Sequence, residues 1–472
     1  MSTATPGQGF QGFKNQAVEI IKQAWPVLVS SWAGIMFGVM DTAMAGHAGP
    51  ADLQAMALAV AIYITVFVGL MGVVHALIPI IAQHFGAGRF AQVGRAWGQG
   101  VWLALGLSLA GAATMLFPNV WLSLSGDIDP VVYDGITWYL RALVFALPGA
   151  LLFRTIYALG SAVSRPKPVM YINLASVAFK LFFNWVFIFG KLGFPALGAP
   201  GAGLSTAVVS WLTLAAGIVV VRRTPYFSRF SLRIGRPQWN DQKELLRLGL
   251  PMGGSYLIEV AAFTFMALLV AQSGMFVTGG HQIMANLSAL SYMMPMALGI
   301  ATASLTAQAI GAGNLPLARL TGRAGIVLVF LGAALTALLV IAFKGPILAM
   351  YTNDAQVAAV AAALLQLLPW FHLCDSMQCI GSYLLRAYKV AVVPLLLQIV
   401  ALTGFGLVGG WWLAYGPGAG SLMPVLNRVA PGAPAGAGAM WFMAMLGLGL
   451  SAMLLFVWYR HVVNRAARKL TH

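Results

Sequence analysis

The chain has 472 residues, of which 60% are hydrophobic and only 8% are charged. A water-soluble globular protein carries about 25% charged residues, so this composition excludes that class and indicates a polytopic helical membrane protein. The formal net charge of +16 would suit a nucleic-acid partner. However, the sequence has no motif that reads DNA or RNA, no glycine-rich phosphate loop and no zinc-ligand spacing, so we expect no nucleic acid.

The first residues, MSTATPGQGFQGFKNQ, lack the charged and then apolar pattern of a secretory signal, and we expect no cleaved leader. Apolar windows then predict twelve transmembrane helices, because a helix needs about 20 residues to cross the hydrocarbon core. In chain order, they are expected near residues 16–42, 52–80, 93–117, 132–160, 168–190, 201–221, 246–272, 282–309, 321–343, 355–385, 391–415 and 437–460.

The loops between these spans differ in charge. Lysine and arginine gather in alternate loops and at both ends of the chain, Arg386 and Lys389 among them. The other side holds only Lys191, Lys344 and Arg428, and it also holds acids such as Asp127 and Asp129. The positive-inside rule therefore predicts a multi-pass membrane protein with both termini in the cytoplasm.

The sequence also repeats itself at one nearly constant shift, a little under half of its length. AQHFGAGRF (82–90) matches AQAIGAGNL (307–315), and Pro26 matches Pro251. Each half has six spans, so both insert with the same orientation and form a parallel repeat. We expect an all-α polytopic membrane protein with twelve transmembrane helices in two pseudo-symmetric six-helix bundles around a central cavity. Its parts are an N-terminal bundle (1–221), a cytoplasmic basic linker (222–244) and a C-terminal bundle (245–472).

Single residues carry further expectations. Pro26 and Pro251 are candidate hinges within their helices, and the two GAG turns need glycine for tight bends. Cys374 and Cys379 lie in one apolar segment, where packing as free thiols is expected rather than a disulfide.

Three of the eleven acidic residues lie within apolar spans: Asp41, Glu259 and Asp375. A carboxylate at bilayer depth costs about 2.5–3.5 kcal/mol on insertion scales, so such residues usually face the protein interior or a water-filled path. Burial favours proton uptake, and carboxylate oxygens can also hold a sodium ion. The sequence leaves both cations open, and the alternative is a simple polar contact between helices.

Several segments resemble the MATE family of multidrug and toxic-compound extrusion transporters, in particular its NorM-like branch. They cover both halves of the chain: GVMDTAMAGH (38–47), FNWVFIFG (183–190), PMGGSYLIE (251–259), QIMANLSALSYMMPMALG (282–299) and LCDSMQCIGSYLLRAYK (373–389). The resemblance implies that Asp41 couples transport to a cation in the first bundle. It implies a sodium or proton site at Glu259 and Asp375 in the second bundle.

The resemblance also assigns polar neighbours, for which a hydrogen bond between helices is the alternative. Asn184 and Thr206 would surround Asp41, while Gln282 and Tyr292 would line the second-bundle cavity. Lys180 is a departure, because relatives usually have asparagine there. Since Lys180 lies four residues before Asn184, the two share a helix face.

We therefore hypothesise an ion pair between Lys180 and Asp41 that a proton or a substrate opens. The alternative is that Lys180 extends outward to the membrane surface. A second departure is Phe371, where some relatives have tyrosine. His372 lies three residues before Asp375, so it is either a packed histidine or part of a proton relay.

The leading function is a secondary active antiporter that exports amphipathic or cationic organic compounds in exchange for H⁺ or Na⁺ by alternating access. The alternative is a lipid-linked saccharide flippase of the same broad superfamily. The chain has no HExxH or GxSxG motif and no nucleotide-binding motif, so we expect neither an enzyme nor an ATP-driven pump. Expected partners are small-molecule drugs or toxic metabolites and membrane lipids. We expect no cofactor beyond the coupling ion, and a monomer.

Overall fold

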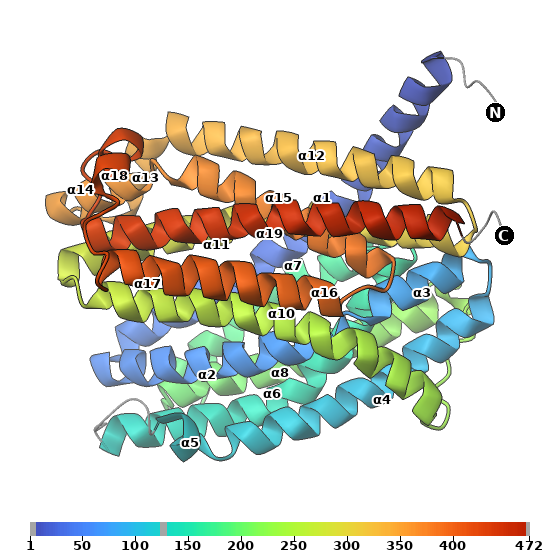
Figure 1. Ribbon diagram of the computed structural model, residues 1–472. Helices are drawn as coiled ribbons and strands as arrows, with labels where there is room; N and C mark the ends of the chain where they lie inside the picture. Colours follow the sequence, from blue (N-terminus) through green and yellow to red (C-terminus); the bar gives the residue numbers. More distant parts are fainter. Residues whose placement is uncertain (1–5, 123–129, 469–472) are drawn as a thin grey trace. The chain divides into compact units, whose positions relative to one another are not determined.

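The computed structural model describes residues 6–122 and 130–468, and these residues form helices joined by short connections, without a β-strand (Figure 1). The all-α class expected from the sequence is confirmed. Asp127 and Asp129 lie outside the described residues.

The helices form two compact units. The N unit comprises Pro26–Tyr256, and the C unit comprises Met1–Trp25 together with Leu257–His472. The N unit holds most of α1 (Pro6–Ala48), then α2 (Pro50–Val74), α3 (Leu77–Gly86), α4 (Phe90–Met115), α5 (Pro118–Leu122), α6 (Pro130–Ala162), α7 (Lys167–Phe189), α8 (Ala199–Arg223), α9 (Pro225–Ser228) and the first half of α10 (Trp239–Ala271). The C unit holds α11 (Met275–Gly311), α12 (Leu315–Ala342), α13 (Lys344–Tyr351), α14 (Ala355–Leu364), α15 (Leu368–Ala387), α16 (Val392–Gln398), the π-helix η1 (Ile399–Val408), α17 (Gly409–Ala414), α18 (Met423–Val429) and α19 (Ala435–Arg468).

Each of the twelve expected spans coincides with a helix or a broken helix. Within the described residues, 10 helices are long and apolar enough to cross a membrane. The pair α14 and α15, bent by 50° at its break, would be an eleventh span. The remaining expected span corresponds to α4, which has 26 residues but is not one of the helices apolar enough to count as a candidate span.

The internal repeat reappears in the packing of each unit. Gly100 on α4 lies so close to Leu77 that a Cβ would come within 2.3 Å of Leu77 Cδ1. Gly325 on α12 lies against Thr302 in the same way, with 2.2 Å to Thr302 Cγ2. Gly325 and Thr302 are the equivalents of Gly100 and Leu77 in the second copy of the repeat. The sequence repeat therefore marks a repeated close approach of two helices.

The two GAG turns also adopt matching conformations. Gly88 has φ 70° and Gly313 has φ 72°, which is the left-handed region that side chains other than glycine rarely adopt. Each turn follows the end of a helix, α3 or α11, and each is followed at once by the next helix. The expected tight turns are confirmed.

The helices α1 and α10 both pass from one unit to the other. The division in α1 falls between Trp25 and Pro26, and that in α10 falls between Tyr256 and Leu257, shortly after Pro251. Both prolines lie inside their helices, where each removes a backbone hydrogen bond and weakens the helix locally. The domain boundaries expected near residues 221 and 245 stay a prediction.

Residues 222–244, expected as a basic linker, pack within the N unit against α4. A Cβ at Gly94 would lie 2.0 Å from the Phe230 carbonyl oxygen, so only glycine lets the linker backbone approach α4 this closely. Next to Gly94 on α4, Arg95 Nε donates to Asp241 Oδ2 at 2.8 Å. The linker is thereby attached to α4 by backbone packing and by an ion pair.

Candidate functional site

The polar site of the N unit comes from three helices. On α7, Lys180 and Asn184 are one helical turn apart and both are buried. On α8, Ala202 and Thr206 are likewise one turn apart. Asp41 comes from α1 and is buried as well. The four-residue spacing on α7 and on α8 places the two groups of each helix on one face, toward Asp41.

Small residues and a cap determine how closely α7 and α8 approach. A Cβ at Gly201 would lie 2.6 Å from the Phe187 carbonyl oxygen, so the two helix backbones are in direct contact there. The first turn of α8 is held by Asp52 from α2, whose Oδ1 accepts the backbone N–H of Ala199 at 2.8 Å. The start of α8, and with it the position of its polar turn, is therefore fixed by two other helices.

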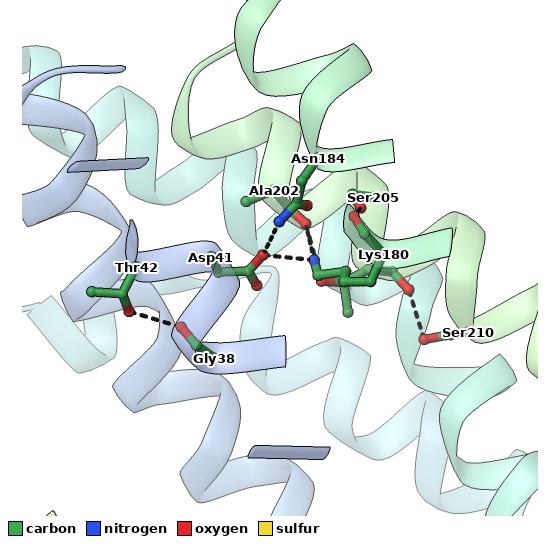
Figure 2. Close-up of polar contacts among 9 residues, drawn as sticks. Gly38, Asp41, Thr42, Lys180, Asn184, Ala202, Ser205 and Ser210 are labelled. Carbon is green, nitrogen blue, oxygen red and sulfur yellow. Dashed lines mark hydrogen bonds and ion pairs between the residues drawn. The ribbon is translucent and has the colours of Figure 1, made fainter. Parts of the chain in front are cut away.

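Lys180 and Asp41 form an ion pair with 2.9 Å between Nζ and Oδ1. Figure 2 shows how the surrounding groups converge on the two charges. The Lys180 ammonium donates to Thr206 Oγ1 at 2.7 Å and to the Ala202 carbonyl oxygen at 3.0 Å. Asn184 Nδ2 donates to the same Asp41 oxygen at 2.7 Å. The predicted Lys180–Asp41 contact is present. Asn184 contacts Asp41 as expected, whereas the hydrogen bond of Thr206 is to Lys180.

This ion pair is enclosed. The Lys180 side chain is 0% exposed and that of Asp41 is 8% exposed, so the alternative in which Lys180 extends outward is wrong. The ring of Phe37, one turn before Asp41 on α1, lies 6.0 Å from the ammonium. Tyr139 of α6 is buried within electrostatic range of Asp41. Removing two charges from water is costly unless geometry and hydrogen bonds are nearly complete, as they are here.

The C unit brings three of the predicted residues together. Asp375 on α15 is buried and Glu259 on α10 is half-buried, and the two acids lie within electrostatic range of each other. Tyr292 on α11 interacts with both acids and shares a hydrogen bond with Cys379. Cys374 and Cys379 are free thiols, as expected.

One basic residue, Arg386, is buried and interacts with an acid of the C unit. It was expected among the basic residues of a cytoplasmic loop, but it lies in the last turn of α15 and is 5% exposed. Its guanidinium lies 4.8 Å from the centre of the Tyr383 ring, and it interacts with Glu259. The spacing of Asp375, Cys379, Tyr383 and Arg386 at four, four and three residues places them on one helix face. That periodicity was the signal that could have found Arg386.

The remaining residues expected to line the cavity, His372 and Gln282, differ in their exposure. His372 is 1% exposed, and its Nε2 atom has no hydrogen-bond partner within the described residues. The Oδ1 atom of Asp375 is equally buried and without a partner there. Whether His372 belongs to a proton relay stays a prediction. Gln282 is exposed on the surface of the C unit.

Phe371 belongs to an aromatic core where some relatives have tyrosine. Its ring packs 5.0 Å from that of Trp441, and the ring of Phe263 lies 6.1 Å from each of them. The Trp441 indole N–H donates to His281 Nδ1 at 3.0 Å. In this chain, residue 371 therefore contributes an aromatic ring to the core and no hydroxyl.

A second cation within the N unit lies among aromatic rings. The Arg154 guanidinium of α6 lies 5.4 Å from the Tyr157 ring and 5.7 Å from the Phe67 ring. It also interacts with Tyr63 and Tyr256. Aromatic faces stabilise a guanidinium by about 0.5–2 kcal/mol, depending on how fully it is desolvated.

Comparison with known proteins agrees with this architecture. The sequence model of the MatE family matches the chain twice, over residues 26–186 and 251–412. The two matches begin at the equivalent prolines Pro26 and Pro251, so they follow the internal repeat. A probable multidrug resistance protein NorM from Aromatoleum aromaticum is 37% identical over 404 residues, which cover 84% of this chain and 86% of the relative. The multidrug resistance protein MdtK of Edwardsiella ictaluri is 30% identical, with 97% of this chain and 100% of the relative covered.

Solved structures share the fold at lower identity. A eukaryotic MATE transporter, AtDTX14, aligns with a TM-score of 0.84 at 19% identity and covers 97% of this chain and 99% of its own. A mutant of the Vibrio cholerae MATE transporter VcmN aligns with the same TM-score at 17% identity, covering 96% and 98%. The chain belongs to the MATE family of membrane transporters.

Proposed function

We propose that this protein is a secondary active antiporter that exports amphipathic, cationic organic compounds from bacteria in exchange for H⁺ or Na⁺. Multidrug resistance proteins among its relatives support the substrate class. The observation that carries the proposal is the Asp41 carboxylate, buried inside a membrane-spanning unit and neutralised by a single lysine.

Such a pair can act as a switch because its partners can be exchanged. A proton or an organic cation that neutralises Asp41 leaves the buried Lys180 ammonium without its counter-ion. Breaking one side of a buried ion pair costs about 3–5 kcal/mol. A shift of a two-state equilibrium from 1:99 to 99:1 needs about 5.5 kcal/mol. One exchange at Asp41 therefore supplies most of the free energy needed to favour the opposite-facing state.

The acids of the C unit form the second coupling site in this proposal. Glu259 and Asp375 lie within electrostatic range of each other, and one buried oxygen of Asp375 has no protein partner in the described residues. A proton or a sodium ion bound here would satisfy that oxygen. Tyr292, and with it Gln282 and His372, would line the path of the substrate.

Alternating access in this proposal uses the helices that pass between the units. Pro26 and Pro251 each remove one backbone hydrogen bond, and the division between units falls at or shortly after them. Bending at these prolines would let the units move without melting α1 or α10. The protein would act as a monomer in the bacterial inner membrane, with both termini cytoplasmic and no cofactor.

The test is transport of a fluorescent organic cation by proteoliposomes under imposed proton or sodium gradients. We expect gradient-driven export that Asp41→Asn abolishes and that Glu259→Gln and Asp375→Asn reduce. Glu19→Gln on α1 is the matched control, because it neutralises an acid that lies outside the proposed sites. Export that persists without a gradient, or when all three acids are neutralised, would contradict the proposal. Scrambling of lipid-linked saccharides instead would favour the flippase.

A further inference from the structure

The N unit already contains a cation at the place where a coupling ion would bind. We infer that the Lys180 ammonium is a tethered replacement for that ion, so the Asp41 site admits no sodium ion. This inference rests on the proposed function, whose coupling through Asp41 it refines. It confines any sodium coupling to the C unit.

The geometry around Nζ is that of a cation site. Its three neighbours are a carboxylate oxygen of Asp41 at 2.9 Å, the Thr206 hydroxyl at 2.7 Å and the Ala202 carbonyl at 3.0 Å. Carboxylate, hydroxyl and carbonyl oxygens are the ligands that hard metal cations take from proteins. A lysine ammonium has three N–H donors, and these three oxygens use all of them.

The same site retains one oxygen that the ammonium does not use. Asn184 donates its Nδ2 to Asp41, and its own Oδ1 is buried with no partner in the described part of the chain. A buried amide oxygen without a donor is rare, since it forfeits its hydration. Together with Asp41, Ala202 and Thr206, this oxygen would complete a ligand set if Lys180 were replaced by a neutral side chain that carries an oxygen.

A sodium ion cannot share the site with the ammonium. The site is closed, because Lys180 and Asn184 are 0% exposed and the Phe37 ring lies 6.0 Å from Nζ. Two like charges about 4 Å apart in a protein weaken binding roughly a thousandfold. The ammonium already occupies the position among the Asp41, Ala202 and Thr206 oxygens that a metal ion would need. Asp41 supplies one negative charge, which Lys180 already balances.

The experiment measures the binding of radiolabelled sodium to the purified full-length protein. Glu259→Gln and Asp375→Asn first remove the acids of the C unit. On this background we expect no saturable binding that depends on Asp41. Adding Lys180→Asn should create saturable sodium binding, roughly a thousandfold tighter than any binding by the background variant that retains Lys180. Adding Asp41→Asn to this protein should abolish the binding again. Lys191→Asn, the same replacement on an exposed connection, is the matched control and should leave binding unchanged.

Two further measurements keep the inference open to refutation. Lys180→Arg retains a cation and should bind no sodium, whereas binding by this variant would overturn the inference. If Lys180→Asn does not fold, the test uses the protein that retains Lys180. Sodium binding that depends on Asp41 in this protein would overturn the inference. The absence of such binding would support it. Because the readout is binding, this result is independent of whether the reconstituted protein exports organic cations.

Discussion

The buried ion pair of the N unit leads to a prediction about stability. Replacing Lys180 by methionine keeps much of the length of the side chain and removes its charge. Asp41 would then remain buried with Asn184 as its hydrogen-bond donor and with no counter-ion. Removing one partner of a buried pair destabilises a protein by about 3–5 kcal/mol. For units of this size, 1 kcal/mol shifts the midpoint of thermal unfolding by about 2–4 °C, so we expect a loss of about 10 °C.

A double-mutant cycle separates the ion pair from packing. Asp41→Asn alone strands the ammonium and should cost a similar amount. The double variant Asp41→Asn with Lys180→Met leaves no buried charge, and it should be more stable than the sum of the single losses predicts, by about 2–4 kcal/mol.

The assay is thermal unfolding in detergent, followed by circular dichroism of the helices. Lys191→Met, on an exposed connection, is the control and should change the midpoint little. If the two single losses simply add in the double variant, the pair contributes no coupling energy and the reasoning fails.

Three further predictions concern the framework around the site. Asp52→Ala removes the carboxylate that accepts the Ala199 N–H at the start of α8, so we expect a loss of about 1–2 kcal/mol in thermal unfolding, most of it recovered by Asp52→Asn. Gly94→Val would place a Cβ 2.0 Å from the Phe230 carbonyl oxygen, so the linker must leave α4. Limited proteolysis should then cut the linker faster, and an unchanged rate would argue against this packing. Pro26→Ala restores a backbone hydrogen bond inside α1, so we expect a stabler helix, by roughly 1–3 kcal/mol, and slower turnover in proteoliposomes. Equal turnover would count against a hinge.

Much of the fold follows from the sequence alone, because a membrane constrains it locally. Apolar runs of about 20 residues must become helices, since backbone groups in lipid have no other way to be hydrogen-bonded. The match of Pro26 with Pro251 predicted the repeat, which the packing of Gly100 and Gly325 then displayed. The spacing of Lys180 and Asn184 indicated a shared face, and so a contact with Asp41 that the structure contains.

The tertiary structure decided what local patterns leave open. Ala202 and Thr206 accept the other two hydrogen bonds of Lys180. Residue spacing within α7 does not predict these bonds, because they depend on how α8 packs against α7 at Gly201. Arg386 counted as a loop cation because it lies near the end of a span, yet packing buries it on the face of α15 that carries Asp375. Hydrophobicity and helical period are properties of one segment. Which faces meet depends on side-chain fit between segments far apart in the chain, and only the folded chain reveals that fit.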